Sequence, residues 1–271
     1  MGEASYPKKS VLLGLILLGL VLSSLVAFPT YILSFPAFGS PLAFHISSSW
    51  LMGGALLLLA AAGSYSLARS QPGGQEESPL HTATYAVLPS VVTLVAFLSL
   101  RILEDRLFFT MGLALAGLLL ATVLAGQYHS GKGWSRVFTR WTLDLVAYGG
   151  AAFLYTTLYG LKARSLLSAT GVSLLSAALA LEILRGSGEV VQIWLYASVT
   201  GLVLGELTWV LNYWGTGAQA GGSVILLIFY LITALARQCL TRRLERRLIF
   251  EFLLLALLGM ALLGWLFSWT W

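Results

Sequence analysis

The chain has 271 residues, of which 58% are hydrophobic and only 10% are charged. These proportions lie far outside those of soluble proteins, and the apolar residues form runs of about 20 with short polar breaks, as in membrane-spanning helices. They exclude a sizeable soluble catalytic domain. The basic residues behind the net charge of +5 are therefore interpreted as determinants of membrane orientation and not as a nucleic-acid surface. The partners we expect are the lipid bilayer and other membrane subunits.

The chain divides at prolines, glycines and charged clusters into nine predicted spans. Their residues are 11–33, 46–68, 83–103, 107–126, 138–160, 164–184, 191–213, 221–238 and 248–270. The predicted fold is an all-α polytopic membrane bundle that forms a single transmembrane domain over residues 1–271. The segment from Lys8 to Leu33 starts like a signal peptide, but its apolar part is long and no clean cleavage site follows, so we expect a retained helix.

Basic residues set the predicted orientation, because cytoplasmic loops of membrane proteins carry an excess of Lys and Arg. With the N-terminus in the cytoplasm, 12 of the 16 basic residues fall on the cytoplasmic side. The cytoplasmic connections are then 69–82, 127–137 and the Arg-rich segment 237–247. We interpret the last as a topological anchor, and the alternative is that it binds anionic lipid head groups. We expect an integral protein of a prokaryotic plasma membrane, the cell inner membrane, with the C-terminus outside.

Two segments suggest an internal repeat. Residues 98–103 resemble 179–184, and further along the chain 112–115 resemble 201–204. The order is kept across two units of three helices, spans 2–4 and spans 5–7. A unit with an odd number of helices enters the membrane from opposite sides when it is repeated, so this would be an inverted repeat of the kind found in transporters.

The predicted span 138–160 carries a polar stripe. Its members recur at steps of four and seven, which places them along one side of a helix, and they are Arg140, Asp144, Tyr148, Tyr155 and Tyr159. A polar stripe of this length is expected to face the interior of the bundle. Arg140 and Asp144 are spaced for a structural ion pair, and the alternative is that they open a polar path along the tyrosines.

Glu206 lies within the predicted span 191–213, with Trp209 continuing the same helix face. A charged side chain in hydrocarbon costs about 2.5–3.5 kcal/mol on insertion scales, so it normally faces protein or water. Glu206 is interpreted either as a proton or cation site or as a structural carboxyl bonded to a neighbouring helix. Gly201 and Gly205 form a small-residue pair that would allow such a helix to approach closely.

A second cluster is predicted at the outer face, where His45, Glu104, Asp105 and Arg106 lie at span ends. A histidine with paired carboxylates could perform acid–base chemistry. The alternative is that these charges satisfy the ends of helices. The three histidines fall at different span ends and Cys239 is the single cysteine, so neither haem nor zinc is predicted, and we expect no cofactor and no metal.

These features favour a small transporter or permease for an unidentified solute, coupled to protons or cations. Its binding and translocation residues would be the polar stripe together with Glu206 and Trp209. Two alternatives stay open: a non-catalytic subunit of a larger membrane complex, and a membrane-embedded enzyme that acts on a lipid through the outer cluster. A cavity that reaches Glu206 would favour transport, an outer pocket that joins His45 to Glu104 would favour the enzyme, and a fully packed interior would favour the subunit.

Overall fold

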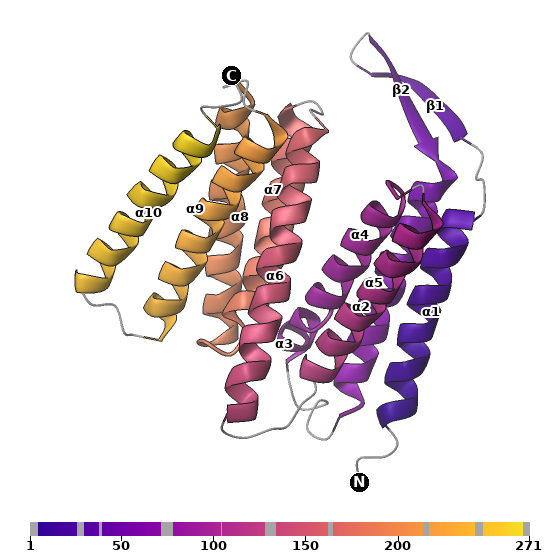
Figure 1. The fold of residues 1–271 in the computed structure, drawn as a ribbon, viewed down its shortest axis with the longest axis horizontal. Helices are drawn as coiled ribbons and strands as arrows, with labels where there is room; N and C mark the ends of the chain where they lie inside the picture. Colours follow the sequence, from indigo (N-terminus) through magenta and orange to yellow (C-terminus); the bar gives the residue numbers. More distant parts are fainter. Residues whose placement is uncertain are drawn as a thin grey trace. The chain divides into compact units, whose positions relative to one another are not determined.

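The structure is a computed structural model, and it describes residues 5–25, 30–37, 40–71, 78–103, 105–127, 134–161, 165–213, 217–241 and 246–267. Ten helices and two strands lie in these ranges (Figure 1): α1 (Ser5–Leu25), β1 (Thr30–Ala37), β2 (Ser40–Ser47), α2 (Ser48–Arg69), α3 (Pro79–Thr84), α4 (Val87–Leu100), α5 (Arg106–Gln127), α6 (Trp134–Gly160), α7 (Ser165–Leu184), α8 (Val190–Tyr213), α9 (Ala218–Leu240) and α10 (Arg246–Phe267).

The predicted class, an all-α membrane bundle, is confirmed. Seven candidate membrane spans that are long and apolar enough to cross a bilayer lie in the described part of the chain. Two further predicted spans correspond to α6, a helix of 27 residues whose hydropathy is lowered by its polar stripe, and to α10, whose apolar part runs over Phe250–Trp265. Nine long helical segments therefore match the nine predicted spans, if α3 and α4 are taken as one.

The first span ends earlier than predicted, because residues 30–33 belong to a β-hairpin and not to a helix. Strands β1 and β2 pair antiparallel, with Thr30 opposite Ser47 and Ala37 opposite Ser40. Prolines cannot donate to a helical hydrogen-bond ladder, and in this hairpin Pro36 lies opposite Pro41. Thr30, Tyr31, Ile32 and Phe35 of β1 are β-branched or aromatic, and such residues favour strands over helix.

The third predicted span is broken at Tyr85, between α3 and α4. The amides of Tyr85 and Ala86 donate to carbonyls three residues earlier, at 3.2 and 3.1 Å, in place of the regular four-residue pattern. Pro89 has no amide to donate to the carbonyl of Tyr85, and the first turn of a helix is where a proline is tolerated. The break therefore follows from the sequence Ala-Val-Leu-Pro.

The expected single transmembrane domain is organised as two compact units. Unit 1 comprises residues 1–78 and 88–131, and unit 2 comprises 79–87 and 132–271. In unit 1, α1 packs against α2 and α5. Gly19 lies against Leu56 and Gly63 lies against Leu12, so small residues set the close approach of α1 and α2.

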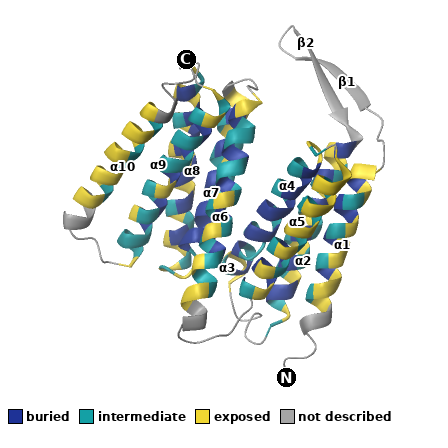
Figure 2. Ribbon diagram, viewed as in Figure 1, coloured by how far each residue is buried: buried dark blue, intermediate teal, exposed yellow. Residues whose placement is uncertain are grey.

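In unit 2, α6 packs against both α7 and α9, and α7 packs closely against α8. The predicted close approach at Gly201 and Gly205 is found here. A Cβ atom at Gly201 would lie 2.5 Å from the carbonyl oxygen of Ser173, and one at Gly205 would lie 2.9 Å from the Ser173 Cβ. Helix α10 packs against α9, and Figure 2 shows it as mostly exposed in unit 2.

The predicted inverted repeat remains a prediction. If spans 2–4 matched spans 5–7, α4 and α5 would correspond to α7 and α8. The α7–α8 pair is the most closely packed in the described structure, whereas α4 and α5 show no comparable approach there. The Arg-rich segment 237–247, predicted as a loop, is helical in α9 up to Leu240 and again from Arg246.

Candidate functional site: a charged cluster and an apolar crevice in unit 2

The polar stripe of α6 faces the interior of unit 2, as expected. Tyr155 is fully buried, and its hydroxyl hydrogen-bonds the Ser176 hydroxyl of α7 at 2.8 Å. The Tyr159 hydroxyl donates to the Leu211 carbonyl of α8 at 2.8 Å. Both tyrosines therefore hold α6 against its neighbours, and their hydroxyl groups are engaged within the protein.

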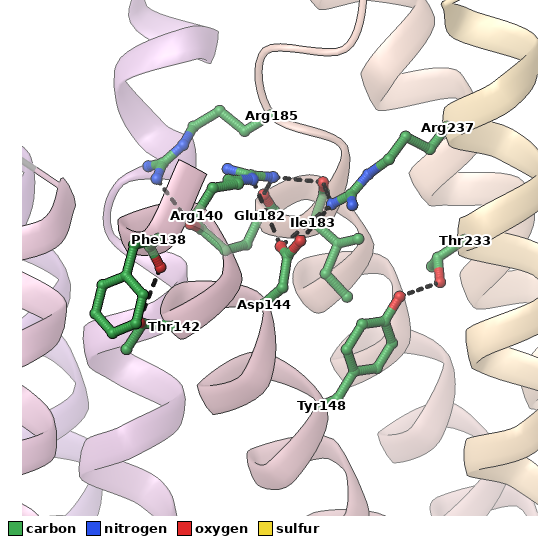
Figure 3. A network of polar contacts seen from close by, with 10 residues as sticks. All are labelled: Phe138, Arg140, Thr142, Asp144, Tyr148, Glu182, Ile183, Arg185, Thr233 and Arg237. Atoms are coloured by element: carbon green, nitrogen blue, oxygen red, sulfur yellow. Dashed lines mark hydrogen bonds and ion pairs between the residues drawn. The ribbon is translucent and has the colours of Figure 1, made fainter. Parts of the chain in front are cut away.

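Asp144 is the centre of a charged cluster at one end of unit 2 (Figure 3). The Arg140 Nε lies 3.5 Å from its Oδ1, which confirms the predicted pairing of these two residues. The Arg237 Nη2 of α9 lies 3.0 Å from Oδ2 and 3.2 Å from Oδ1. One carboxylate therefore joins two arginines from two helices, and the partner from α9 was not predicted.

The same two arginines bind the C-terminus of α7. The Arg140 Nη2 donates to the carbonyls of Glu182 and Ile183 at 3.0 and 2.5 Å, and the Arg237 Nη2 donates to the Ile183 carbonyl at 2.7 Å. The last carbonyls of a helix have no partner within the helix, and the negative end of its dipole favours cations. Gly186, with φ of +80°, then turns the chain away from α7.

A second ion pair lies beside the first. The Arg185 Nη2 is 2.8 Å from the Glu182 Oε1, and the two side chains are only 8% and 2% exposed. The Arg185 guanidinium also stacks on the ring of Tyr85, with its Cζ 4.1 Å from the ring centroid. Tyr85 belongs to the short part of the third span that is grouped with unit 2.

The cluster carries one positive charge in excess. Three guanidinium groups, from Arg140, Arg185 and Arg237, face two carboxylates, from Asp144 and Glu182. Arg185 and Glu182 are buried, whereas the side chains of Arg140 and Arg237 are 30% and 35% exposed. The excess charge therefore lies on accessible arginines, where an anionic group could bind.

An apolar crevice of about 420 Å³ opens at mid-helix depth between α6, α9 and α10. It has leucines, one glycine and three hydroxyl-bearing residues along its walls: Tyr148, Ser223, Leu226, Leu227, Tyr230, Gly259, Leu262 and Leu263. A second crevice of about 410 Å³ shares Leu227, Gly259 and Leu262. Mostly apolar walls with a few hydroxyl groups are typical of sites for hydrophobic ligands of this volume.

The crevice and the charged cluster lie along the same face of α9. Residues 223, 226, 230, 233 and 237 follow one another at steps of three and four, which places them on one side of the helix. On α6, Tyr148 lies one turn from Asp144. The Tyr148 hydroxyl hydrogen-bonds the Thr233 hydroxyl at 2.9 Å (Figure 3), and Tyr148 also forms part of the crevice wall.

Glu206 and Trp209 do not join this site. Both are exposed, on the side of α8 away from α7, whereas Gly201, Gly205 and Thr208 are buried. The glycine pair brings α7 close, but the expected bond between Glu206 and that neighbouring helix is not formed. Neither crevice has Glu206 in its walls.

The described residues include only part of the outer cluster. Glu104 and the His45 side chain lie outside the described residues, although His45 pairs with Ile32 in the hairpin backbone. Asp105 is exposed, and its Oδ1 accepts a hydrogen bond from the Leu107 amide at 2.9 Å, which makes it the cap of α5. Arg106 is exposed in the first turn. Asp105 thus has the helix-end role that was the alternative interpretation.

Within the described residues, no three His, Cys, Asp or Glu side chains gather as metal ligands would. Sequence reasoning missed Arg237 as the partner of Asp144, because the Arg-rich segment 237–247 was interpreted only as a whole, as a topological anchor or as a binder of anionic lipid head groups. The sequence does carry a signal for the contact between Arg237 and Asp144, namely how far each residue lies from the end of its helix. Arg237 lies three residues before the end of α9 and Asp144 lies ten residues after the start of α6, so both lie near the same end of an antiparallel pair.

The fold and the site define a polytopic α-helical membrane protein with a basic cluster at the end of one helical unit and an apolar crevice beside it. Residues 28–266 match the model of a family described as a protein of unknown function, DUF5656. The chain belongs to this family. No curated protein matches the chain, and no solved structure matches it.

Proposed function

We propose that the protein is a small membrane transporter for an anionic amphiphile, a molecule with one anionic group and a long apolar chain. The observation that carries the proposal is the alignment of the crevice with the partly exposed Arg140 and Arg237 along α6 and α9. The anionic group would bind the two guanidinium groups, and the chain would lie between α9 and α10.

The dimensions of α9 support this assignment. Leu227, in the wall of the crevice, is ten residues from Arg237, which corresponds to about 15 Å at 1.5 Å per residue. An amphiphile whose head is held at Arg237 therefore reaches Leu227 with the first part of its chain. Tyr148, Ser223 and Tyr230 offer hydroxyl groups on the way, where a polar head would need them during movement across the bilayer.

The proposed orientation places the charged cluster at the cytoplasmic side, with the N-terminus inside. Arg140, Arg185 and Arg237 come from three segments, yet they lie at the same end of unit 2. Cytoplasmic segments of membrane proteins carry an excess of Lys and Arg, so the end of unit 2 that holds these three arginines is expected to be the cytoplasmic one. The amphiphile would enter from the lipid of the inner leaflet, and coupling to a proton or cation gradient is part of the proposal.

The experiment is lipid exchange in liposomes. The purified chain is reconstituted in phosphatidylcholine vesicles with a trace of fluorescent phosphatidylglycerol, and dithionite then bleaches the probe that reaches the outer leaflet. We expect protein-dependent exchange of fluorescent phosphatidylglycerol, and slower exchange of fluorescent phosphatidylcholine. A pH gradient imposed across the vesicles tests the coupling.

Two matched variants locate the path. Leu226→Trp fills the crevice and is expected to slow the exchange at least tenfold. Leu174→Trp adds the same ring at an exposed position of α7 and is expected to leave it unchanged. Exchange no faster than in empty vesicles would refute transport, and equal exchange in both variants would refute the crevice as its route.

A role as a subunit of a larger membrane complex is the second candidate. It is favoured by one observation, the exposure of Glu206 among apolar residues on α8. If phosphatidylglycerol binds the crevice but is not exchanged, the crevice would serve as a lipid-binding site of such a subunit.

A further inference from the structure

The two apolar crevices of unit 2, of about 420 and 410 Å³, meet at one contact between α9 and α10. We call them the first and the second crevice. Leu227 of α9 and Gly259 of α10 belong to the walls of both. A Cβ atom at Gly259 would lie 2.9 Å from both Cδ atoms of Leu227, so the two helices touch at this point. An acyl chain cannot pass between Leu227 and Gly259, and the contact therefore separates the two crevices.

The two crevices leave this contact in different directions. The first extends toward α6, because Tyr148 of that helix is in its wall together with Leu226 and Tyr230 of α9. The second follows α10 toward the start of that helix, where its wall contains Glu251, Leu254, Leu255 and Leu258. The apolar space beside α9 is thus forked, with one branch on each side of the contact.

Both branches have their charged end at the same end of unit 2. Helix α10 follows α9 in the chain and packs against it in the antiparallel direction (Figure 1). Glu251 lies eight residues before Gly259, about 12 Å along α10, and Arg237 lies ten residues after Leu227, about 15 Å along α9. Since Leu227 touches Gly259, the two charged residues differ in depth by only about 3 Å. One head group at this end could therefore extend a chain into each branch.

We propose that the lipid bound here has two acyl chains, one in each crevice. This inference rests on the proposed function and names the class of its substrate, a diacyl lipid with an anionic head. The anionic group binds Arg140 and Arg237, and the Leu227–Gly259 contact lies between the two chains. A fatty acid or another amphiphile with one chain would occupy one branch and leave the other to the surrounding bilayer.

The charges at the head end distinguish this lipid from the bulk of the bilayer. Arg140 and Arg237 carry the excess positive charge of the cluster and favour an anionic phosphate. Glu251 is exposed in the wall of the second crevice, and its carboxylate can accept hydrogen bonds from hydroxyl groups of the same head. Phosphatidylglycerol has a phosphate, two free hydroxyl groups and two chains, so it is the probe that matches both ends of the site.

Lipid exchange in liposomes tests the fork by comparing two probes, fluorescent phosphatidylglycerol and fluorescent lysophosphatidylglycerol, which has the same head and one chain. Leu258→Trp fills the second crevice, and Leu258 is 61% exposed, so the larger ring does not disturb the core. We expect this variant to slow the two-chain probe about tenfold and the one-chain probe less than about twofold. Leu226→Trp in the first crevice is expected to slow both probes, and Leu174→Trp on α7 neither.

The outcomes separate this inference from the proposed function. If Leu226→Trp slows exchange but Leu258→Trp slows neither probe, transport through the first crevice stands and the second chain site is refuted. If Leu258→Trp slows both probes equally, the two crevices form one path for a single chain, and the fork is refuted as well. Absence of exchange in the unaltered protein would refute transport.

Binding tests the fork without transport. The purified chain in detergent is mixed with equal amounts of the two lipids, and native mass spectrometry measures which one it retains. We expect the unaltered protein to prefer phosphatidylglycerol about tenfold, and Leu258→Trp and Leu254→Trp, both in the second crevice, to lose most of this preference. Loss of the preference in both variants would support the two-chain site even in a protein that exchanges no lipid. A preference that is equal in the unaltered protein and both variants would overturn the proposal.

Discussion

Asp144 and Arg237 are 93 residues apart in sequence, and Arg237 donates to both carboxylate oxygens at 3.0 and 3.2 Å. The bond connects α6 to α9 and positions the same arginine to cap α7 through the Ile183 carbonyl. Three helices are thus joined at one residue pair. The arrangement is structural, and it also holds two accessible guanidinium groups beside the crevice.

Loss of this carboxylate is expected to destabilise unit 2. Asp144→Asn leaves Arg140 and Arg237 without their shared counter-ion, and the side chain of Asp144 is 18% exposed. Breaking a fully buried pair costs about 3–5 kcal/mol, so we expect about 2 kcal/mol at this partly exposed site. The free energy of unfolding in mixed detergent micelles measures it. Asp105→Asn, which can still cap α5, is the control, and an equal change in both would contradict a special role for Asp144.

Replacement by alanine is expected to have opposite effects on stability at two glycines, one in the α7–α8 contact and one at an open position of α6. Gly201→Ala places a Cβ 2.5 Å from a backbone oxygen, so the helices must separate, at a cost of about 1–3 kcal/mol. Gly149→Ala on α6 meets nothing within 4 Å and is expected to stabilise its helix by up to about 1 kcal/mol. Unfolding of both variants in the same micelles decides the point. A neutral Gly201→Ala would mean that α7 and α8 are not packed this closely.

Removal of the Tyr155 hydroxyl and removal of the Tyr148 hydroxyl are expected to differ in cost, because their partners keep different hydrogen bonds. Tyr155→Phe removes the partner of the buried Ser176 hydroxyl, which should cost about 1 kcal/mol. Tyr148→Phe should cost less, because the Thr233 hydroxyl still donates to the Phe229 carbonyl at 2.7 Å. The measurement is a comparison of the two unfolding free energies. A larger loss for Tyr148→Phe would show that the Tyr148–Thr233 bond has a greater part in holding α6 than its geometry implies.

The proposed orientation can be tested at the two ends of α7. Leu161→Cys precedes this helix and Ser187→Cys follows it, each in the Cys239→Ser background. The excess of arginines at the cluster end predicts that Leu161→Cys reacts with a membrane-impermeant maleimide in intact cells, and that Ser187→Cys reacts only after the membrane is opened. The reverse pattern would place the cluster outside and would overturn entry from the inner leaflet.

The sequence predicted the long helices well, because runs of apolar residues determine where a helix can cross a bilayer. Breaks at single prolines were harder to place. Pro36 and Pro41 indicate only that a helix ends before them, and the pairing of β1 with β2 depends on contacts between the strands. Pro89 likewise divides a span whose composition alone reads as continuous.

The site was also predicted only in part, because part of it depends on contacts between helices that are far apart in sequence. Helical spacing places Arg140, Asp144 and Tyr148 on one face, and that face does turn inward. Spacing within one helix carries no information about which helix lies opposite, so it predicts neither the bond from Arg237 nor the crevice beside Tyr230, and only the similar depth of Arg237 and Asp144 points to the bond. For Glu206 the expectation of a partner rested on the neighbouring glycines, which lie on another side of α8.

The central claim is that one anionic amphiphile occupies the cluster and the crevice together. The most direct measurement is an electron-microscopy map of the protein in nanodiscs of brominated phosphatidylglycerol, compared with brominated phosphatidylcholine. We predict phosphate density beside Arg140 and Arg237 and bromine density between α9 and α10 near Leu227, stronger with phosphatidylglycerol. An empty crevice, or a lipid chain there whose phosphate lies away from both arginines, would contradict the account.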